Sequence, residues 1–383
     1  NVWLDLDLAG VGQSQERKAH TSSWMQHVIF QGLWHRLLLA IILLLTALVV
    51  AGVNESELPV ILVGIMSARE HVEQRNVIRR TWASSNVASV VVKFVVGSER
   101  ADLHAEAVEN GASTACSDCG EDDVLVVPLP ESYQHLLDKF FHFLVWAMHE
   151  HGGGSTGRGG GGFQYLVKAD DDTYLHLPGL AAALAPAPRL RHYRGHFWVG
   201  RPVRDPGHKN HLAARDYPLQ ELPPYAYGGA YVLSWDVAAF VYRNLAFLSP
   251  GAMRGGGNAE DVQVGLWALA LGVRGTHDPR MVDAGHCHAR AFALFNADPP
   301  LLRALHRAFA AAAGAAGDGD GPLGGGCSAE VQALLEGRFR AQLAERPGHA
   351  SLRTHVGARL LLQEGRAAEA AREFEALLLL LGE

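Results

Sequence analysis

The fold class of this chain is decided by the stretch Phe163-Gln164-Tyr165-Leu166-Val167-Lys168-Ala169-Asp170-Asp171-Asp172. Its first seven residues are rich in aromatic and β-branched side chains, which predicts a buried strand. The three aspartates follow where that strand ends, and α/β sheets bind their ligands at strand ends. Adjacent carboxylates repel one another, so a fold retains such a cluster when a cation or a set of donors compensates it. The alternative is a solvated acidic turn.

Strands and helices alternate on both sides of this stretch. Apolar runs at residues 59–65, 90–96 and 124–127 predict strands, and the residue spacing at 68–82 and 132–150 predicts helices. This alternation predicts an α/β fold with a mixed, largely parallel sheet.

Two later segments carry turn and cap signals. Gly228 and Gly229 predict a turn before a short apolar segment, and Ser234 is a candidate N-cap for a helix that runs to about residue 245. Glu260 and Asp261 open another predicted helix, where the helix dipole favours carboxylates. A capping role is therefore the alternative to a chemical role for these two acids.

Size and charge narrow the function class. The 383 residues can hold one large α/β domain with additional segments. The net charge of -7 argues against a nucleic-acid partner, as does the lack of a basic stripe with interleaved aromatic residues.

Residues 37–53 are apolar apart from Thr46, which is the short end of a membrane-spanning length. A buried core helix and a cleaved signal peptide are the alternatives, and the distance from the N-terminus disfavours the peptide. Basic residues precede the run and Glu55 and Glu57 follow it, so the positive-inside rule places residues 1–36 in the cytosol. The sequence thus predicts a type II signal anchor that contacts the lipid bilayer, with all later residues lumenal.

The four cysteines and the C-terminal helices complete the organisation. An oxidising lumen permits disulfides; Cys116 and Cys119 are candidates for local partners or a redox pair, and Cys287 and Cys327 are a candidate bridge at the end of the main domain. Residues 301–383 are predicted to form a C-terminal helical appendage that packs on the main domain, and part of it resembles one tetratricopeptide helix pair.

Several separate segments between residues 59 and 300 match one family in order. The segments are Arg75-Asn76-Val77-Ile78-Arg79-Arg80-Thr81-Trp82, Phe94-Val95-Val96-Gly97, Ser132-Tyr133 with Lys139, Lys168-Ala169-Asp170-Asp171-Asp172, Tyr227-Gly228-Gly229-Ala230-Tyr231-Val232-Leu233-Ser234, and Glu260-Asp261-Val262 with Gly265. The chain resembles the β-1,3-galactosyltransferase family of Golgi type II glycosyltransferases. The run His277-Asp278-Pro279-Arg280, followed by Cys287, looks most like the branch that builds the glycosaminoglycan linker, galactosyltransferase II.

The resemblance implies a fold, a location and a reaction. Residues 54–300 would form the catalytic domain, with the nucleotide-sugar-binding fold called GT-A, in the lumen of the Golgi apparatus. The implied reaction moves galactose from UDP-galactose to a hydroxyl of a glycan or glycoprotein acceptor, in β-1,3 linkage and with inversion, and it depends on a divalent cation, usually Mn²⁺.

The resemblance also implies residue roles. Asp172 would coordinate the metal and Asp261 would be the catalytic base. The nucleotide-sugar would be contacted by residues around these two, namely Arg79, Asp170, Asp171, Gly228, Gly229 and Glu260. Arg79 has a surface helix arginine as its alternative, and the glycines would let the backbone approach the sugar.

Two departures from the family leave alternatives open. The family carries a histidine about eight residues after Cys287, where this chain has Phe295 followed by Asn296. His286 and His288 are candidate substitutes; otherwise the metal would be held by Asp172, the diphosphate and water. Residues 219–222 are additional near the acceptor region. The alternatives to UDP-galactose transfer are a UDP-N-acetylglucosamine or UDP-N-acetylgalactosamine donor, or a non-catalytic sugar-binding relative.

Overall fold

The computed structural model describes residues 60–98, 117–151, 162–245, 260–314 and 327–345, apart from 86, 88, 209, 216 and 289, together with 368, 371 and 372. All of them belong to one compact unit, Leu58–Glu383. The predicted span at 37–53 and most of the predicted repeat lie outside these residues. None of the helices formed by the described residues is long and apolar enough to span a bilayer.

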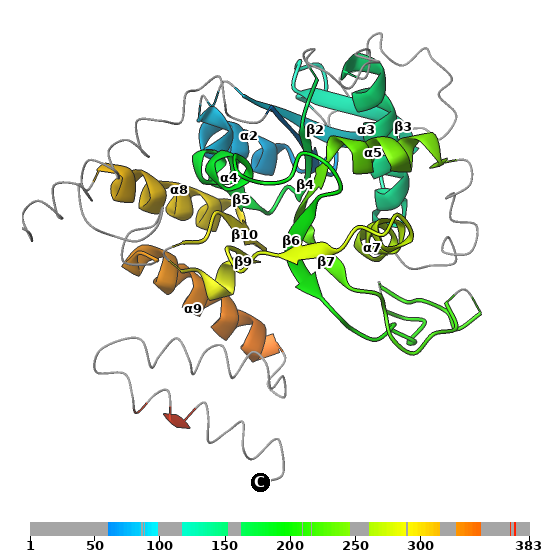
Figure 1. Ribbon diagram of the computed structural model, residues 1–383. Coiled ribbons are helices and arrows are strands. Elements are labelled where there is room, and N and C mark those ends of the chain that lie inside the picture. Colours follow the sequence, from blue (N-terminus) through cyan, green and yellow to red (C-terminus); the bar gives the residue numbers. More distant parts are fainter. Residues whose placement is uncertain are drawn as a thin grey trace, which may run out of the picture. The chain divides into compact units, whose positions relative to one another are not determined.

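A seven-stranded sheet with the order β3-β2-β1-β4-β7-β6-β8 forms the centre of the unit (Figure 1). The strands are β1 Ile61–Met66, β2 Val90–Ser98, β3 Val124–Pro130, β4 Tyr165–Asp170, β6 Tyr193–Trp198, β7 Tyr225–Ser234 and β8 Gly275–His277. β1 pairs in parallel with β2 and β4, β2 with β3, and β6 with β8, whereas β7 runs antiparallel to β4 and β6. The predicted mixed, largely parallel sheet is confirmed.

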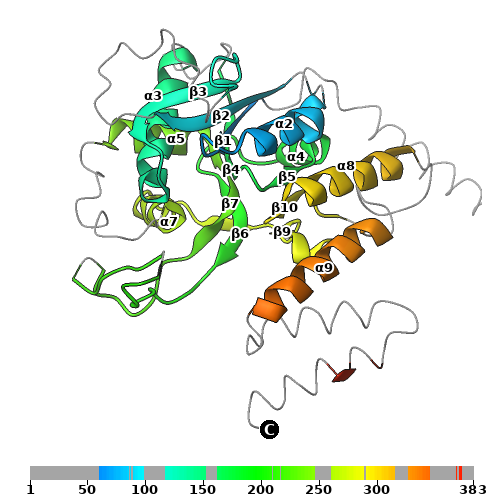
Figure 2. The ribbon, with the colours of Figure 1, turned by 180° about the vertical axis from the view of Figure 1, so that it is seen from behind.

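The central strands β1 and β4 are buried on both faces because their side chains point alternately into two cores. Along β1, Ile61, Val63 and Ile65 face one core, and Leu62 and Met66 face the other. Figures 1 and 2 show two groups of helices on the two sides of the sheet. The first group is α2 Val72–Arg80, α4 Leu177–Leu184 and α8 Pro299–Gly314; the second is α3 Leu136–His151, α5 Trp235–Arg243 and α7 Glu260–Ala270.

The predicted elements need four corrections. The helix predicted for 68–82 is α2, which ends at Arg80 and is followed by the short helix η2 Trp82–Ser84; η3 Tyr133–His135 likewise precedes α3. The glycine turn at 228 and 229 was wrong, because both residues lie inside the continuous strand β7. Ser234 precedes α5 as predicted but makes no side-chain cap, since its hydroxyl donates to Asp236 instead.

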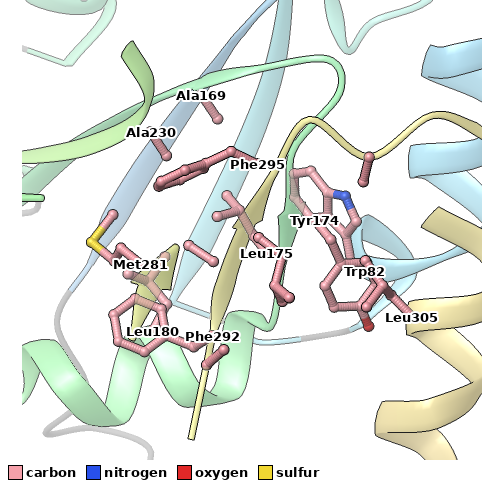
Figure 3. Close-up of a cluster of buried hydrophobic side chains, with 14 of the residues drawn as sticks. Trp82, Ala169, Tyr174, Leu175, Leu180, Ala230, Met281, Phe292, Phe295 and Leu305 are labelled. Carbon is pink, nitrogen blue, oxygen red and sulfur yellow. The ribbon is translucent and has the colours of Figure 1, made fainter. Parts of the chain in front are cut away.

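A small second sheet and the C-terminal helices extend the first core. This sheet has the order β5-β10-β9, with β5 Tyr174–Leu175, β9 Met281–Asp283 and β10 Ala293–Phe295. Figure 3 shows Phe295 of β10 beside Ala169 of β4 and Ala230 of β7. The core also takes in Leu305 of α8 and Leu335 of α9 Ala329–Glu345, so the predicted boundary at residue 300 does not coincide with a break in packing.

One predicted disulfide lies within the described residues. Cys287 and Cys327 are bonded, with 6.1 Å between their Cα atoms, as the sequence had suggested. The bond links the end of η4 Ala284–His286 to the start of α9. Cys119 is also disulfide-bonded, and Cys116 lies outside the described residues.

The fully buried Arg75 fixes the segment before β3 to the segment after β1. Its guanidinium makes a bidentate ion pair with Asp118, at 2.9 Å from Nε to Oδ2 and 2.7 Å from Nη2 to Oδ1. It also donates to the Ser67 hydroxyl and to the carbonyls of Ala68 and Arg69. These partners satisfy a charge that would otherwise be costly to bury.

Removal of the Arg75 charge should therefore destabilise the fold. We expect Arg75→Met to lower the free energy of unfolding by about 3 kcal/mol, because the Asp118 carboxylate loses its bidentate partner inside the protein. Urea unfolding of the variant and the unaltered chain measures the difference. Arg80→Met is the matched control, since Arg80 is exposed on the same helix, and should change stability by less than about 0.5 kcal/mol. Equal losses in both variants would contradict this role.

Candidate active site

The predicted site residues meet in a cavity of about 340 Å³ at the end of β4 and the start of β7. Six of the eight line it, namely Asp170, Asp172, Gly228, Gly229, Glu260 and Asp261. Its other walls come from η3 and the start of α3, the segment between β6 and β7, the start of β7 and the residue after β10. They include Tyr133, Arg201, Asn210, Tyr225, Tyr227 and Asn296. Asp170 and Asp172 thus share one cavity with Asp261, about ninety residues further along the sequence.

Lys168 connects the two acidic segments of this cavity. Its fully buried ammonium lies 2.6 Å from Asp170 Oδ1 and 3.2 Å from Glu260 Oε2, and it donates to the Gly228 carbonyl. The nearby carboxylates raise the pKa of Lys168 far above its usual value, against the effect of burial, so the group stays charged. Sequence reasoning assigned Lys168 no role. The available signal was its position two residues before Asp170, which places both side chains on one face of β4.

Glu260 is held by a second buried contact. The hydroxyl of Tyr231, on β7, donates to Glu260 Oε1. With Lys168 at its other oxygen, this buried carboxylate is fully engaged by the protein. Glu260 thus fixes the first turn of α7 against β4 and β7, and with it the neighbouring Asp261.

Asp261 has the environment of a base that works near neutral pH. Burial, together with the charge of Glu260, raises the pKa of Asp261 to about 7. Lys168 and backbone amides oppose the rise, and the Val262 N–H donates to Asp261 Oδ1 at 2.8 Å. The sequence left open whether burial or the helix N-terminus dominates; in the structure burial does.

The two adjacent glycines meet different neighbours. A Cβ at Gly228 would lie 3.3 Å from Asp261 Oδ2, whereas a Cβ at Gly229 would come within 2.7 Å of the Phe295 ring. Gly228 therefore keeps space beside the carboxylate, and Gly229 makes room for a core aromatic ring.

Asp172 is the carboxylate best placed to hold a cation. Burial and the neighbouring Asp171 raise the pKa of Asp172, and the charges of Lys168 and Arg338 lower it. No described lysine, arginine or histidine makes an ion pair with it. A half-buried carboxylate without an ionic partner among the described residues, at the wall of a cavity, fits a hard cation such as Mn²⁺. The described residues hold no group of three or more His, Cys, Asp or Glu side chains arranged for a metal, so other ligands would come from the substrate, water or an amide.

Asn296 occupies the cavity wall near the position where the family has its histidine. Phe295 is buried in the core, while Asn296 lines the cavity with a left-handed backbone, φ 58°. Its amide nitrogen donates to Asp283 Oδ2 and to the Tyr227 hydroxyl, at 3.3 Å for the latter. Neither His286 nor His288 lines the cavity. The structure thus brings Asn296 to the site and leaves the two histidines outside it.

Two predicted contacts are engaged elsewhere. Arg79 does not line the cavity; its guanidinium pairs with Asp118 and Asp123, each at 2.7 Å, and lies over the Phe94 ring. These ion pairs tie Arg79 to the loop before β3, so it is not a free surface arginine. Asp171 turns away from the cavity and accepts from Ser67 Oγ at 2.7 Å and from His71 Nδ1 at 2.8 Å.

Comparisons with known proteins agree with this geometry. Residues 73–279 match the family model described as galactosyltransferase. The chain is 30% identical to mouse beta-1,3-galactosyltransferase 6 over 56% of this chain and 62% of the relative. It is 27% identical to human lactosylceramide 1,3-N-acetyl-beta-D-glucosaminyltransferase over 56% of this chain and 54% of the relative. It is 28% identical to Arabidopsis thaliana hydroxyproline O-galactosyltransferase GALT5 over 54% of this chain and 28% of the relative.

These similarities cover less than two thirds of each relative's length. The matched region contains both the aspartate triplet and Asp261, and it ends before Asn296 and α9. A family model that spans more than half of the chain, a mixed α/β sheet and a shared acidic cavity all lead to one conclusion: the chain belongs to the galactosyltransferase family.

Proposed function

We propose that the chain transfers a sugar, with galactose preferred, from a UDP-sugar to a hydroxyl of a glycan acceptor, in β-1,3 linkage and with inversion. The observation that carries the proposal is the pair of Asp261, a carboxylate with pKa about 7, and Asp172, a carboxylate without an ionic partner among the described residues, in one cavity. The family membership supports glycosyl transfer.

Asp261 would take the proton from the attacking hydroxyl of the acceptor. A base is most effective when its pKa lies near the working pH, which is the value that burial gives Asp261. The Val262 N–H fixes Oδ1, and the bare Gly228 backbone keeps Oδ2 accessible. Lys168 holds this carboxylate in place indirectly, through Glu260 and the Gly228 carbonyl.

Asp172 would hold a Mn²⁺ ion at the leaving diphosphate, on the side of the sugar opposite to the attacking hydroxyl. When bound, such an ion neutralises the charge that develops on the leaving diphosphate. The cation would be accommodated without displacing an existing ion pair to Asp172 from any described residue. Asp170, which Lys168 already partly neutralises, is left to accept hydrogen bonds from the donor.

Three finer assignments belong to the same proposal. Relatives named for galactosyl transfer and for N-acetylglucosaminyl transfer are both similar to this chain. The similarity alone therefore does not select the donor sugar. The resemblance to the glycosaminoglycan-linker branch supports that acceptor class and a Golgi membrane location, and the apolar run at residues 37–53 supports a membrane anchor. Transfer assays with UDP-galactose, UDP-N-acetylglucosamine and UDP-N-acetylgalactosamine test the donor, and analysis of the product linkage tests the stereochemistry. An α-linked product would contradict inversion.

Loss of the base should abolish turnover but spare the fold. We expect Asp261→Asn to lower kcat by about 10²- to 10⁴-fold, because the amide retains the shape of the carboxylate and cannot accept the proton. We expect Asp172→Ala to raise the Mn²⁺ concentration that gives half-maximal activity. Arg243→Gln, an exposed change on α5, is the control and should leave both quantities unchanged. Full activity in Asp261→Asn would remove this residue from the mechanism.

The pH profile should report the ionisation of Asp261. Because burial raises its pKa to about 7, kcat/KM should rise about tenfold per pH unit below that value and level off above it. Initial rates between pH 5 and 8.5 at fixed Mn²⁺ measure the profile. A flat profile across this range would contradict the assignment.

The same raised pKa has a consequence for stability. Because the pKa of Asp261 is raised from 3.8 to about 7 in the folded state, its contribution to stability is fully present below pH 3.8 and is lost as the pH rises to 7. Asp261→Asn removes the buried charge at neutral pH. The Tm of this variant should therefore exceed that of the unaltered chain by more at pH 8 than at pH 5. A difference that is equal at both pH values would contradict a raised pKa.

A further inference from the structure

The helix α9 lies outside the region matched by the family model and nevertheless contacts the active site. Arg338, near its middle, donates from Nη1 to the carbonyl of Asn296. α9 is fixed in place by Leu335 and Phe339 in the core and by the Cys287–Cys327 bond. Figure 1 shows α9 beside β9. A well-packed helix therefore presents Arg338 to Asn296, which lines the cavity.

A short chain of contacts runs from Arg338 to Asp172. Asn296, whose carbonyl Arg338 binds, holds a left-handed backbone with φ 58°. The next residue, Ala297, donates its N–H to the Asp172 carbonyl at 2.6 Å. The Asn296 side chain is fixed separately, by Asp283 and Tyr227. Arg338 thus acts on a backbone segment that bonds directly to the end of the aspartate triplet.

Most N–H donors of the Arg338 guanidinium have no acceptor among the described residues. It carries five N–H donors, and within the described part of the chain only Nη1 has a protein acceptor. Arg340, two residues further on, instead donates its Nε to Glu336 on the same helix at 2.8 Å. Arg338 borders a second cavity of about 240 Å³, which shares Asn296 with the main cavity. Its charge lies close enough to Asp172 to influence that carboxylate.

We propose that Arg338 binds the diphosphate of the nucleotide-sugar donor and positions Asn296 beside it, which makes α9 a part of the donor site. This inference rests on the proposed function, which places the leaving diphosphate at Asp172. A guanidinium suits that ligand because its planar donors match phosphate oxygens in pairs and it stays charged at every working pH. The cation of Arg338 and the metal at Asp172 would then share the charge of the leaving group.

Calorimetric titration of the full chain with UDP, and separately with uridine, tests the proposal at a fixed Mn²⁺ concentration. Arg338→Met should weaken UDP binding by about tenfold or more, since a charge-assisted hydrogen bond is lost. Uridine lacks the diphosphate, so its affinity should stay within about twofold of the unaltered chain. Arg340→Met is the matched control on the same helix and should leave both affinities unchanged.

Equal weakening of UDP and uridine in Arg338→Met would show a purely structural effect and overturn the proposal, as would unchanged UDP binding. If Arg338→Met does not fold, Arg338→Lys decides: it retains the charge with fewer donors, and it should weaken UDP binding while uridine binding is unchanged. Should the unaltered chain fail to bind UDP, the proposed function itself would fall together with this inference. UDP binding that is retained in Arg338→Met would overturn the role of Arg338 alone.

Discussion

The buried ammonium of Lys168 is the interaction on which the active site depends. It joins Asp170 at the end of β4 to Glu260 at the start of α7 and to the backbone of β7. Three elements that are distant in sequence thereby meet at one charge. A lysine in such a position is costly to bury unless its partners are complete. Because the partners are themselves acids of the cavity, the requirement that stabilises the charge also fixes the geometry of the site.

The two faces of the sheet supply different groups to the active site. The core that contains α3, α5 and α7 carries the proposed base, because α7 begins at the cavity with Glu260 and Asp261. The opposite core contains β10, α8 and α9; it brings Asn296 to the wall of the same cavity and Arg338 to the carbonyl of Asn296. The sheet end thus receives one set of groups from each face. An acceptor and a leaving group require such separate environments.

The sequence predicted those features that follow from local pattern. The strand before the aspartates, the helix that starts at Glu260 and the mixed sheet were all correct, because apolar runs and strand ends are visible in the order of residues. The engagement of Arg79 with Asp118 and Asp123 was not predictable, since nothing local identifies a partner about forty residues away. Asn296 differs from Phe295 by one position, yet one faces the cavity and the other the core. The contact with Arg338 depends on the packing of α9, which a short motif does not encode.

Gly228 and Gly229 are adjacent in β7, but different neighbours require a glycine at each position. Neighbouring residues of a strand point to opposite faces. Position 228 is therefore constrained by Asp261, and position 229 is constrained by the ring of Phe295 in the core. The two sites should therefore diverge independently among descendants of a common ancestor. A larger residue at position 229 would require a smaller one at position 295, whereas the residue tolerated at position 228 would depend on the shape of the acceptor. Of these two positions, substitution of 228 would change substrate selectivity, and substitution of 229 would change the packing of the core.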